Sequence, residues 1–284
     1  MNEALVWVNG QAGALVDVSE RALQYGDGLF ETIRIRCSQP EFLQMHIRRL
    51  KSGCERLKFA DVDWGLLGCE LKELAAQHDN AVLKLILSRR CAGRGYAVHS
   101  GQGVTRIASV QPLPEWPADP ADRGIRVRIC DTQLADQPQL AGIKHLNRLE
   151  QVLARSEWDD PAIVEGLMLS AGDRLIEGTM SNVFVLKEQV LITADLSSCG
   201  VAGVMRSVIL ELAQRLGIDT EIRPVSLVEV KKVRVVFVCN SLMDIWPVVS
   251  IDGFGVFEVG PVTRQLQAAL AACNKAGDGN WYPT

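Results

Sequence analysis

The sequence of 284 residues lacks the features that mark membrane, secreted and nucleic-acid-binding proteins. No apolar run reaches the roughly 18 residues needed to span a bilayer. The N-terminus, Met1-Asn2-Glu3-Ala4, has neither the basic start nor the apolar stretch of a signal peptide, so we expect a cytoplasmic protein. A formal net charge of −4 gives no general electrostatic reason to bind nucleic acid or an anionic membrane. The 48% hydrophobic and 23% charged residues are typical of a globular enzyme.

Motifs for metal ions and disulfides are also missing. The eight cysteines include no Cys-x-x-Cys pair, and the four histidines form no metal-ligand motif, so we expect no metal site. In a reducing cytosol the thiols are expected to pack as small apolar side chains. The cysteines are Cys37, Cys54, Cys69, Cys91, Cys130, Cys199, Cys239 and Cys273.

Prolines are concentrated in one place, residues 111–124, which hold four of the eleven prolines. Proline fixes φ and lacks an N–H donor, so this stretch is expected to be neither helix nor central strand. It is the best domain boundary in the sequence. We therefore predict a small α+β domain at 1–112, a proline-rich linker at 113–124 and a larger domain at 125–284.

Hydrophobic periodicity predicts mixed α and β structure in both domains. Asn9-Gly10 indicates a hairpin whose second strand runs to Val16. A helix is expected over 147–158, with Leu149, Val152 and Leu153 facing inward. Further strands are expected at 4–8, 30–36, 81–88, 104–110, 125–131, 165–170, 174–177, 182–186, 190–193 and 233–239. Further helices are expected around 47–57, 67–75, 204–216 and 262–275.

Lys144 lies in a mostly apolar stretch just before the predicted 147–158 helix. Apolar neighbours disfavour the charged amine and lower its pKa, and a neutral amine is what Schiff-base chemistry requires. A solvated surface lysine is the alternative, and these residues alone favour it.

Two further segments could carry chemistry. Glu177 ends a predicted strand and could pair with a protonated ring nitrogen, although a solvated acid at a turn is the commoner case. Residues 200–206 form a glycine-containing loop that leads into a helix, whose free N–H groups could bind phosphate. An ordinary capped helix is the alternative. The Gly-Asp-Gly strings at 26–28 and 277–279 have no phosphate-loop continuation, and we interpret the second as a turn.

Taken together, these strings resemble the fold-type IV pyridoxal-phosphate enzymes, which include branched-chain and D-amino-acid aminotransferases. Within that group the chain looks like the 4-amino-4-deoxychorismate lyases. The resemblance covers residues 8 to 247 in the right order, and KHLNRL is its most specific part. The matching strings are GDGLFET (26–32), HIRRL (46–50), RGY (94–96), KHLNRLEQVL (144–153), EGTMSNVF (177–184), GVMR (203–206) and CNSLM (239–243).

The resemblance implies a two-domain fold-type IV structure, with a small N-terminal α/β domain and a larger β-rich C-terminal domain that binds pyridoxal 5'-phosphate. It also implies a homodimer. Lys144 would bind the cofactor covalently and act as the catalytic base, and Glu177 would face the pyridine nitrogen. The cofactor phosphate would be held by Arg49, by the amides of Val204 and Met205, and by Ser241. The substrate would be bound by Arg94, Tyr96 and Asn240.

Two departures favour the lyase over the aminotransferases. Met205 stands where many aminotransferases have threonine, and Leu149 stands where they tend to have tyrosine. The implied reaction converts 4-amino-4-deoxychorismate to 4-aminobenzoate and pyruvate, a carbon–oxygen lyase step in folate biosynthesis. The alternatives are a D-amino-acid or branched-chain aminotransferase of the same fold, a cofactor-free Schiff-base enzyme, and a non-catalytic binding protein.

Overall fold

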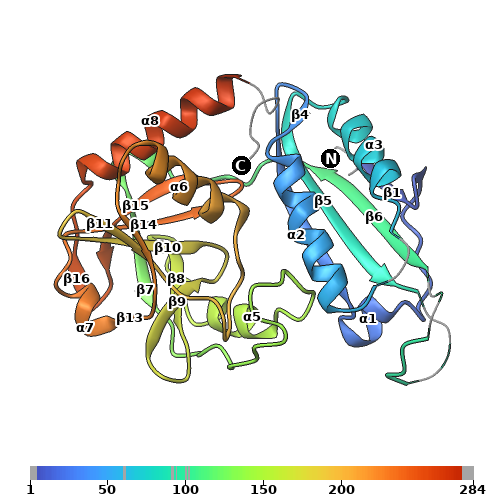
Figure 1. Cartoon of the computed structure of the whole chain (residues 1–284), viewed down its shortest axis with the longest axis horizontal. Coiled ribbons are helices and arrows are strands. Elements are labelled where there is room, and N and C mark those ends of the chain that lie inside the picture. Colours follow the sequence, from blue (N-terminus) through green and yellow to red (C-terminus); the bar gives the residue numbers. More distant parts are fainter. Residues whose placement is uncertain are drawn as a thin grey trace. The chain divides into compact units, whose positions relative to one another are not determined.

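The computed structural model describes residues 5–59, 62–90, 93, 95–99, 101 and 103–276 (Figure 1). The chain forms two compact units. Unit 1 comprises Met1–Pro114 and Ile143–Asn147, and unit 2 comprises Glu115–Gly142 and Arg148–Thr284. The chain therefore leaves unit 1, enters unit 2, and returns to unit 1 for five residues.

Unit 1 is built on a six-stranded antiparallel sheet with strand order β2-β1-β6-β5-β3-β4. Helices α2 and α3 cover one of its faces (Figure 1). The strands are β1 (Leu5–Val8), β2 (Gln11–Ala12), β3 (Gly28–Arg36), β4 (Gln39–Pro40), β5 (Asn80–Arg89) and β6 (Val104–Gln111). The helices are α1 (Arg21–Tyr25), α2 (Leu43–Arg56) and α3 (Trp64–Ala75).

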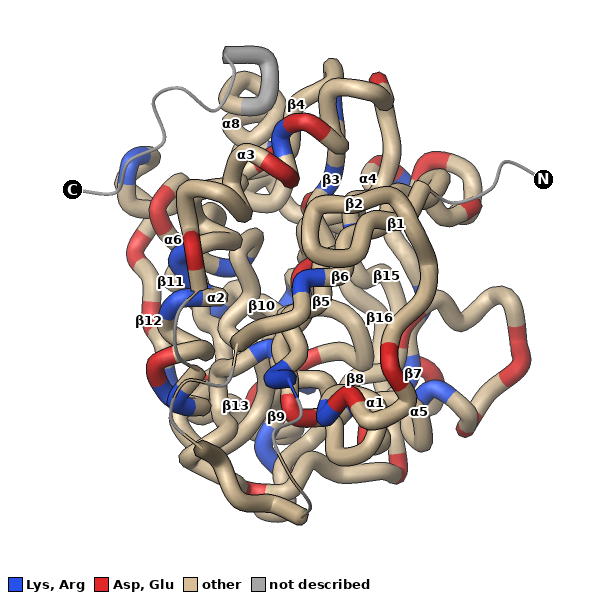
Figure 2. The backbone as a smooth tube through the Cα atoms, turned by 90° about the vertical axis from the view of Figure 1, so that its right-hand side faces the viewer, with Lys and Arg blue, Asp and Glu red and all other residues tan. Residues whose placement is uncertain are grey.

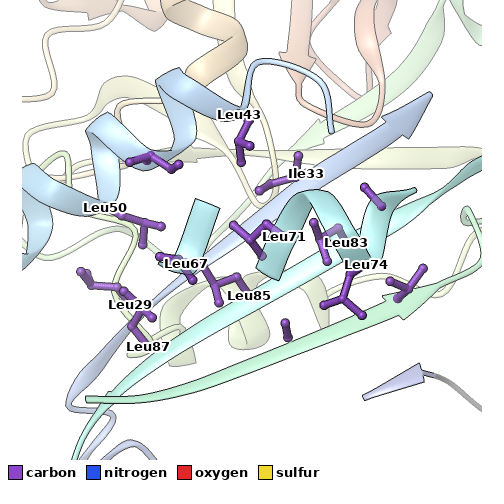
Figure 3. Packing of buried hydrophobic residues seen from close by; sticks show 14 of the residues in the cluster. Leu29, Ile33, Leu43, Leu50, Leu67, Leu71, Leu74, Leu83, Leu85 and Leu87 are labelled. Carbon is purple, nitrogen blue, oxygen red and sulfur yellow. The ribbon is translucent and has the colours of Figure 1, made fainter. Parts of the chain in front are cut away.

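Leucines fill the core of unit 1, and Figure 3 shows them between the two helices and the sheet. Leu50 of α2 and Leu71 of α3 are buried in the same cluster as Leu83, Leu85 and Leu87 of β5. Burying one such side chain contributes about 1.5–3 kcal/mol. Buried and half-buried residues alternate along β3, because successive side chains of a strand point to opposite faces. The buried residues are apolar except for one acid, Glu31. That position matters for the site described below.

Unit 2 contains a ten-stranded sheet whose middle strands close on themselves. Strand β10 pairs with β14 on one side and with β9 on the other, so β10, β14, β15, β7, β8 and β9 form a ring. The strands are β7 (Ile125–Ile129), β8 (Ile163–Leu169), β9 (Arg174–Gly178), β10 (Asn182–Lys187), β11 (Val190–Thr193), β12 (Thr220–Ile222), β13 (Val225–Ser226), β14 (Val235–Asn240), β15 (Asp244–Ile251) and β16 (Gly255–Val256). The helices are α4 (Pro120–Arg123), α5 (Leu149–Arg155), α6 (Val204–Arg215), α7 (Leu227–Val230) and α8 (Pro261–Ala276).

Charged residues of both signs are interspersed along the tube of each unit, as Figure 2 shows. Many of them pair within their own unit. Arg106 of β6, for example, forms a two-bond ion pair with Glu70 of α3, and Arg223 forms one with Glu229 of α7. The described part of the chain thus carries no long segment of one charge.

The predicted α+β fold class is confirmed, and several details are corrected. Strand β2 ends at Ala12, and Leu15 and Val16 are exposed rather than part of a longer strand. The proline-rich stretch contains the short helix α4, with Pro120 in its first turn, where the missing N–H is tolerated. The Gly-Asp-Gly string at 277–279 lies outside the described residues.

The helix predicted over 147–158 is shorter and faces the other way. It spans Leu149–Arg155 as α5, and Leu149, Val152 and Leu153 are exposed rather than inward. The small side chain of Ala154 is fully buried instead, in a cluster that includes Trp158. Helix α5 therefore buries Gln151 and Ala154 and exposes its bulky apolar side chains.

The predicted packing of the cysteines is right for some and wrong for others. Cys54, Cys130, Cys199 and Cys239 are buried free thiols. Cys37 and Cys69 are exposed, because Cys37 lies in the turn between β3 and β4 and Cys69 lies on the outer face of α3. Cys91 lies outside the described residues.

The predicted domain ranges placed residues 143–147 in the second domain, but the structure places them in unit 1. Backbone hydrogen bonds to β3 are the reason. The N–H of Phe30 donates to the carbonyl of Lys144 (3.0 Å), and the N–H of Leu146 donates to the carbonyl of Gly28 (3.0 Å). These five residues pair with the edge of β3, and no local sequence pattern predicts this pairing.

Candidate active site

Lys144 is held against β3 in unit 1. Its neighbour Ile143 is 3% exposed and packs into the core of that unit, and His145 forms an antiparallel bridge with Leu29. The Lys144 Nζ atom lies 4.3 Å from the centroid of the Phe30 ring, within the range of a cation–π contact. The amine therefore lies beside an aromatic ring, and the backbone on either side of Lys144 is held in unit 1 by Ile143 and His145.

Glu31, the residue after Phe30, forms the centre of a buried polar cluster. Arg49 donates from Nε to Glu31 Oε1 (2.8 Å) and from Nη2 to Glu31 Oε2. His46 Nδ1 lies 2.6 Å from Glu31 Oε2. His46 and Arg49 stand three residues apart on α2, so they share one face of that helix. The predicted phosphate ligand Arg49 is thus held by a carboxylate and a helix together.

The pKa values of this cluster follow from its charges. Burial acts to raise the pKa of Glu31, but Arg49 and His46 outweigh it and lower that pKa to about 2. Burial lowers the pKa of His46, so the imidazole is neutral at pH 7. Because an ionised carboxylate only accepts hydrogen bonds, His46 carries its proton on Nδ1.

Glu177 is the last residue but one of β9 in unit 2 and is 3% exposed. The backbone N–H of Val201 donates to its Oε2 (2.8 Å). Across the β9–β10 pair from Glu177, Asn182 donates to the carbonyl of Val201 (2.9 Å) and accepts from the N–H of Gly203 (3.1 Å). Glu177 and Asn182 therefore fix the loop that leads into α6.

The start of α6 offers backbone amides to a ligand. Gly203 is its N-cap and supplies no side-chain cap, and the N–H of Ser207 makes the first intrahelical bond, to Gly203. The amides of Val204 and Met205 precede that bond, where helices bind anions. A Cβ at Gly203 would fall 2.0 Å from Asn182 Oδ1, so only glycine fits there. The Met205 side chain is buried, which leaves its amide as its contribution.

Glu165 organises the turn that follows Glu177. It lies wholly buried on β8 and accepts five hydrogen bonds, three from backbone N–H groups and two from hydroxyls. Thr179 and Ser181 supply the hydroxyls, the latter at 2.7 Å. Burial raises the pKa of Glu165, since its partners are neutral.

The predicted substrate-binding residues are in less uniform settings. Asn240 joins two turns, because it donates to the carbonyl of Met180 (3.0 Å) and accepts from the N–H groups of Leu242 and Met243. Ser241 lies in the turn between β14 and β15. Tyr96 is 82% exposed and stacks edge-on against Tyr25. Arg94 lies outside the described residues.

Comparisons with known proteins place this geometry in a family. The family described as Amino-transferase class IV matches residues 28–251. The chain is 34% identical to the aminodeoxychorismate lyase of Vibrio harveyi, over 94% of this chain and 99% of the relative. The chain belongs to the class IV aminotransferase family.

Two further proteins show how the resemblance is distributed. The crystal structure of 4-amino-4-deoxychorismate lyase from Pseudomonas aeruginosa matches with a TM-score of 0.91 and 45% identity, covering 94% of this chain and 98% of that one. The D-alanine aminotransferase of Bacillus licheniformis is 31% identical, covering 90% of each chain. The predicted family and fold are therefore confirmed, and identity is higher to the two lyases than to this aminotransferase.

Sequence reasoning missed three polar residues that organise the segments around the candidate site residues. Glu31 and Asn182 stood inside matching strings without a role, and Glu165 was not singled out. The available signal was the same each time: a charged or amide side chain among the buried residues of a strand. Such a residue must find partners, and the partners here are distant in sequence.

Among the described residues, no group of three or more His, Cys, Asp or Glu residues is arranged to hold a metal ion. In the same part of the chain, no helix combines the length and apolar character needed to cross a membrane.

Proposed function

We propose that this chain is an aminodeoxychorismate lyase, which uses pyridoxal 5'-phosphate to convert 4-amino-4-deoxychorismate to 4-aminobenzoate and pyruvate. The observation that carries the proposal is the 45% identity and TM-score of 0.91 to the Pseudomonas aeruginosa lyase over 94% of the chain. The aminotransferase alternative is less favoured, because the D-alanine aminotransferase relative is 31% identical.

The residues present fit the cofactor. A lysine amine beside an aromatic ring, an arginine fork and uncapped helix amides match an aldehyde and a phosphate. A buried carboxylate, Glu177, matches a protonated ring nitrogen. We assign Arg49, Val204, Met205 and Ser241 to the phosphate. When bound, pyridoxal phosphate supplies an electron sink for the electrons released as a C–H bond next to the amine breaks.

The protein's own residues supply anchoring and proton transfer. Lys144 would hold the cofactor through its Nζ atom, and the same amine in its neutral form would take the proton from the substrate carbon that carries the substrate amine. Glu177 holds a proton at the ring nitrogen by its negative charge, with its own Oε2 fixed by the Val201 amide. Loss of the enolpyruvyl group makes the substrate ring aromatic, and Lys144, now an ammonium, protonates the leaving group to give pyruvate. Arg94, Tyr96 and Asn240 are assigned to the substrate.

A test of the function separates the lyase from the aminotransferase. Purified protein with pyridoxal phosphate and 4-amino-4-deoxychorismate should release 4-aminobenzoate and pyruvate in equal amounts with no keto acid added. Pyruvate is followed by reduction with lactate dehydrogenase, and 4-aminobenzoate by fluorescence. Turnover that requires a keto-acid acceptor would show an aminotransferase instead.

We further propose that the protein works as a homodimer in the cytoplasm. Exposed Leu149, Val152 and Leu153 on α5 support an interface, because contiguous exposed apolar side chains mark contact surfaces. The free thiols of the described cysteines suit a reducing compartment.

A further inference from the structure

Glu31 is a charged residue on a face that is otherwise apolar. It lies on the buried face of β3 between Leu29 and Ile33, and its exposure is 0%. An ionised carboxylate in such a place is costly unless it is paired and hydrogen-bonded. Glu31 in the core of unit 1 therefore needs charged and hydrogen-bonding partners.

Both carboxylate oxygens of Glu31 are engaged by α2. Arg49 donates to one oxygen from Nε and to the other from Nη2, and His46 donates from Nδ1 to the second oxygen. Two parallel N–H···O bonds fix the plane of a guanidinium as well as its position. The Arg49 side chain is 12% exposed, so it reaches from this buried anchor toward the surface of unit 1.

We propose that Glu31 is a positioning residue for the cofactor phosphate: it holds the Arg49 guanidinium in one orientation so that the arginine is ready to bind the phosphate. The inference rests on the proposed function, which assigns Arg49 to that phosphate. An arginine side chain has several rotatable bonds, and fixing them before the ligand arrives removes an ordering cost from binding.

Electrostatics alone predict the opposite effect of Glu31. A carboxylate next to Arg49 offsets part of the positive charge and repels a phosphate dianion. Removing the negative charge would then tighten phosphate binding, whereas removing a positioning group would weaken it. The two accounts differ in the sign of one measurement.

The measurement is the ratio of the affinities for pyridoxal phosphate and for pyridoxal, which lacks the phosphate. Each is obtained by absorbance titration of cofactor-stripped full-length protein, with borohydride trapping to place the adduct on Lys144. In Glu31→Gln we expect this ratio to fall at least about tenfold, with pyridoxal affinity little changed. A ratio that is unchanged or higher overturns the proposal.

Glu70→Gln is the matched control. Glu70 binds Arg106 in the same unit through the same two nitrogen atoms, Nε at 2.8 Å and Nη2 at 2.7 Å. It lies in no part of the proposed site, so its ratio should equal that of the unaltered protein. An equal fall in both variants would mean that any lost ion pair in unit 1 weakens binding, and would overturn the specific role of Glu31.

Glu31→Asp covers the case in which Glu31→Gln does not fold. This variant keeps the negative charge but withdraws the carboxylate oxygens by one methylene. A positioning role therefore predicts a lower affinity ratio, whereas an effect of charge alone predicts an unchanged ratio. If the unaltered protein binds pyridoxal as tightly as pyridoxal phosphate, the Arg49 assignment and this inference both fall. The lyase function is judged separately by pyruvate release, which distinguishes the two failures.

Discussion

Glu31 in unit 1 and Glu165 in unit 2 are both wholly buried, but they are stabilised by different partners. Glu31 faces a guanidinium and an imidazole, and its pKa falls to about 2. Glu165 faces backbone amides and two hydroxyls, and burial raises its pKa. Burial alone therefore does not decide the charge of a carboxylate in this fold. The charge of the partner decides it.

The comparison extends to what each acid holds. Glu31 fixes a cation, Arg49, whereas Glu165 gathers the turn between β9 and β10 that follows Glu177. Unit 1 thus holds Lys144 and Arg49, and unit 2 holds Glu177 and the backbone amides at the start of α6. Each unit can be disabled separately, which gives the following tests.

Lys144→Ala should have the largest effect, because it removes both the covalent anchor and the proposed base from unit 1. We expect turnover to fall by roughly four orders of magnitude or more, and borohydride to label no lysine at the site. The matched control is Lys51→Ala, since Lys51 also lies over an aromatic ring in unit 1, that of Trp64. Labelling of another lysine in the unaltered protein would contradict the assignment.

Glu177→Gln tests the contribution of unit 2. It keeps the shape of the side chain but removes the charge that holds the ring proton, so we expect turnover to drop about a hundredfold or more. Affinity for pyridoxal phosphate, measured by absorbance titration, should change much less. Glu157→Gln is the control, because Glu157 also accepts backbone N–H bonds in unit 2. Near-full activity of Glu177→Gln would show that the acid is placed wrongly.

The two buried glutamates should respond to pH in opposite directions. The folded pKa of Glu31 lies below its ordinary value of 4.5, so its stabilisation is full above that value and is lost as pH falls toward 2. The loss is on the order of 3 kcal/mol. Glu165 has a raised pKa, so the folded protein loses stability as pH rises above 4.5.

Urea unfolding of the unaltered protein, Glu31→Gln and Glu165→Gln across pH 2–7 measures both trends. The unfolding free energy of the unaltered protein minus that of Glu31→Gln should decrease on acidification. The unfolding free energy of the unaltered protein minus that of Glu165→Gln should increase. Parallel pH dependence for the two variants would contradict the assigned cause, the difference between charged and neutral partners.

The smallest expected effect concerns the apolar faces of two helices. Helix α2 of unit 1 buries Leu43 and Leu50, whereas α5 of unit 2 exposes Leu149 and Leu153. Leu153→Ser should weaken the proposed dimer about tenfold and change the unfolding free energy of each chain by less than about 0.5 kcal/mol. Analytical ultracentrifugation is the measurement, and Val228→Ser, on the exposed side of α7, is the control. An unchanged dimer would remove α5 from the interface.

Much of the fold could be predicted because its signals are local. The alternation of β3 and the helical spacing of α6 depend on neighbours within a few residues, and both elements formed as expected. The inward face of α5 was predicted wrongly, since bulky apolar residues at helical spacing did not reveal that Ala154 would pack inside. Local patterns predict an element better than they predict its partner.

The site was predictable only in part for the same reason. Lys144 and Glu177 stand in strings specific enough to suggest roles, and those roles stay predictions. The link from Glu31 to Arg49 spans 18 residues, and that from Glu165 to Ser181 spans 16, so neither leaves a repeating pattern. The return of residues 143–147 to β3 depends on backbone–backbone hydrogen bonds, which any side chains could accompany, so the composition of the segment does not predict it.

The return of residues 143–147 to unit 1 determines when unit 1 can complete its fold during synthesis. Unit 1 lacks its last five residues until the ribosome has synthesised the chain through Asn147, after residues 115–142 of unit 2 have been synthesised. The nascent chain must therefore hold an incomplete sheet edge at β3 while more than twenty residues of the next unit pass through the exit tunnel. A fragment ending at residue 114 would leave the same edge uncovered. No single cut therefore separates the two units, because a cut after Asn147 removes β7 from unit 2 and a cut at the prolines removes residues 143–147 from unit 1.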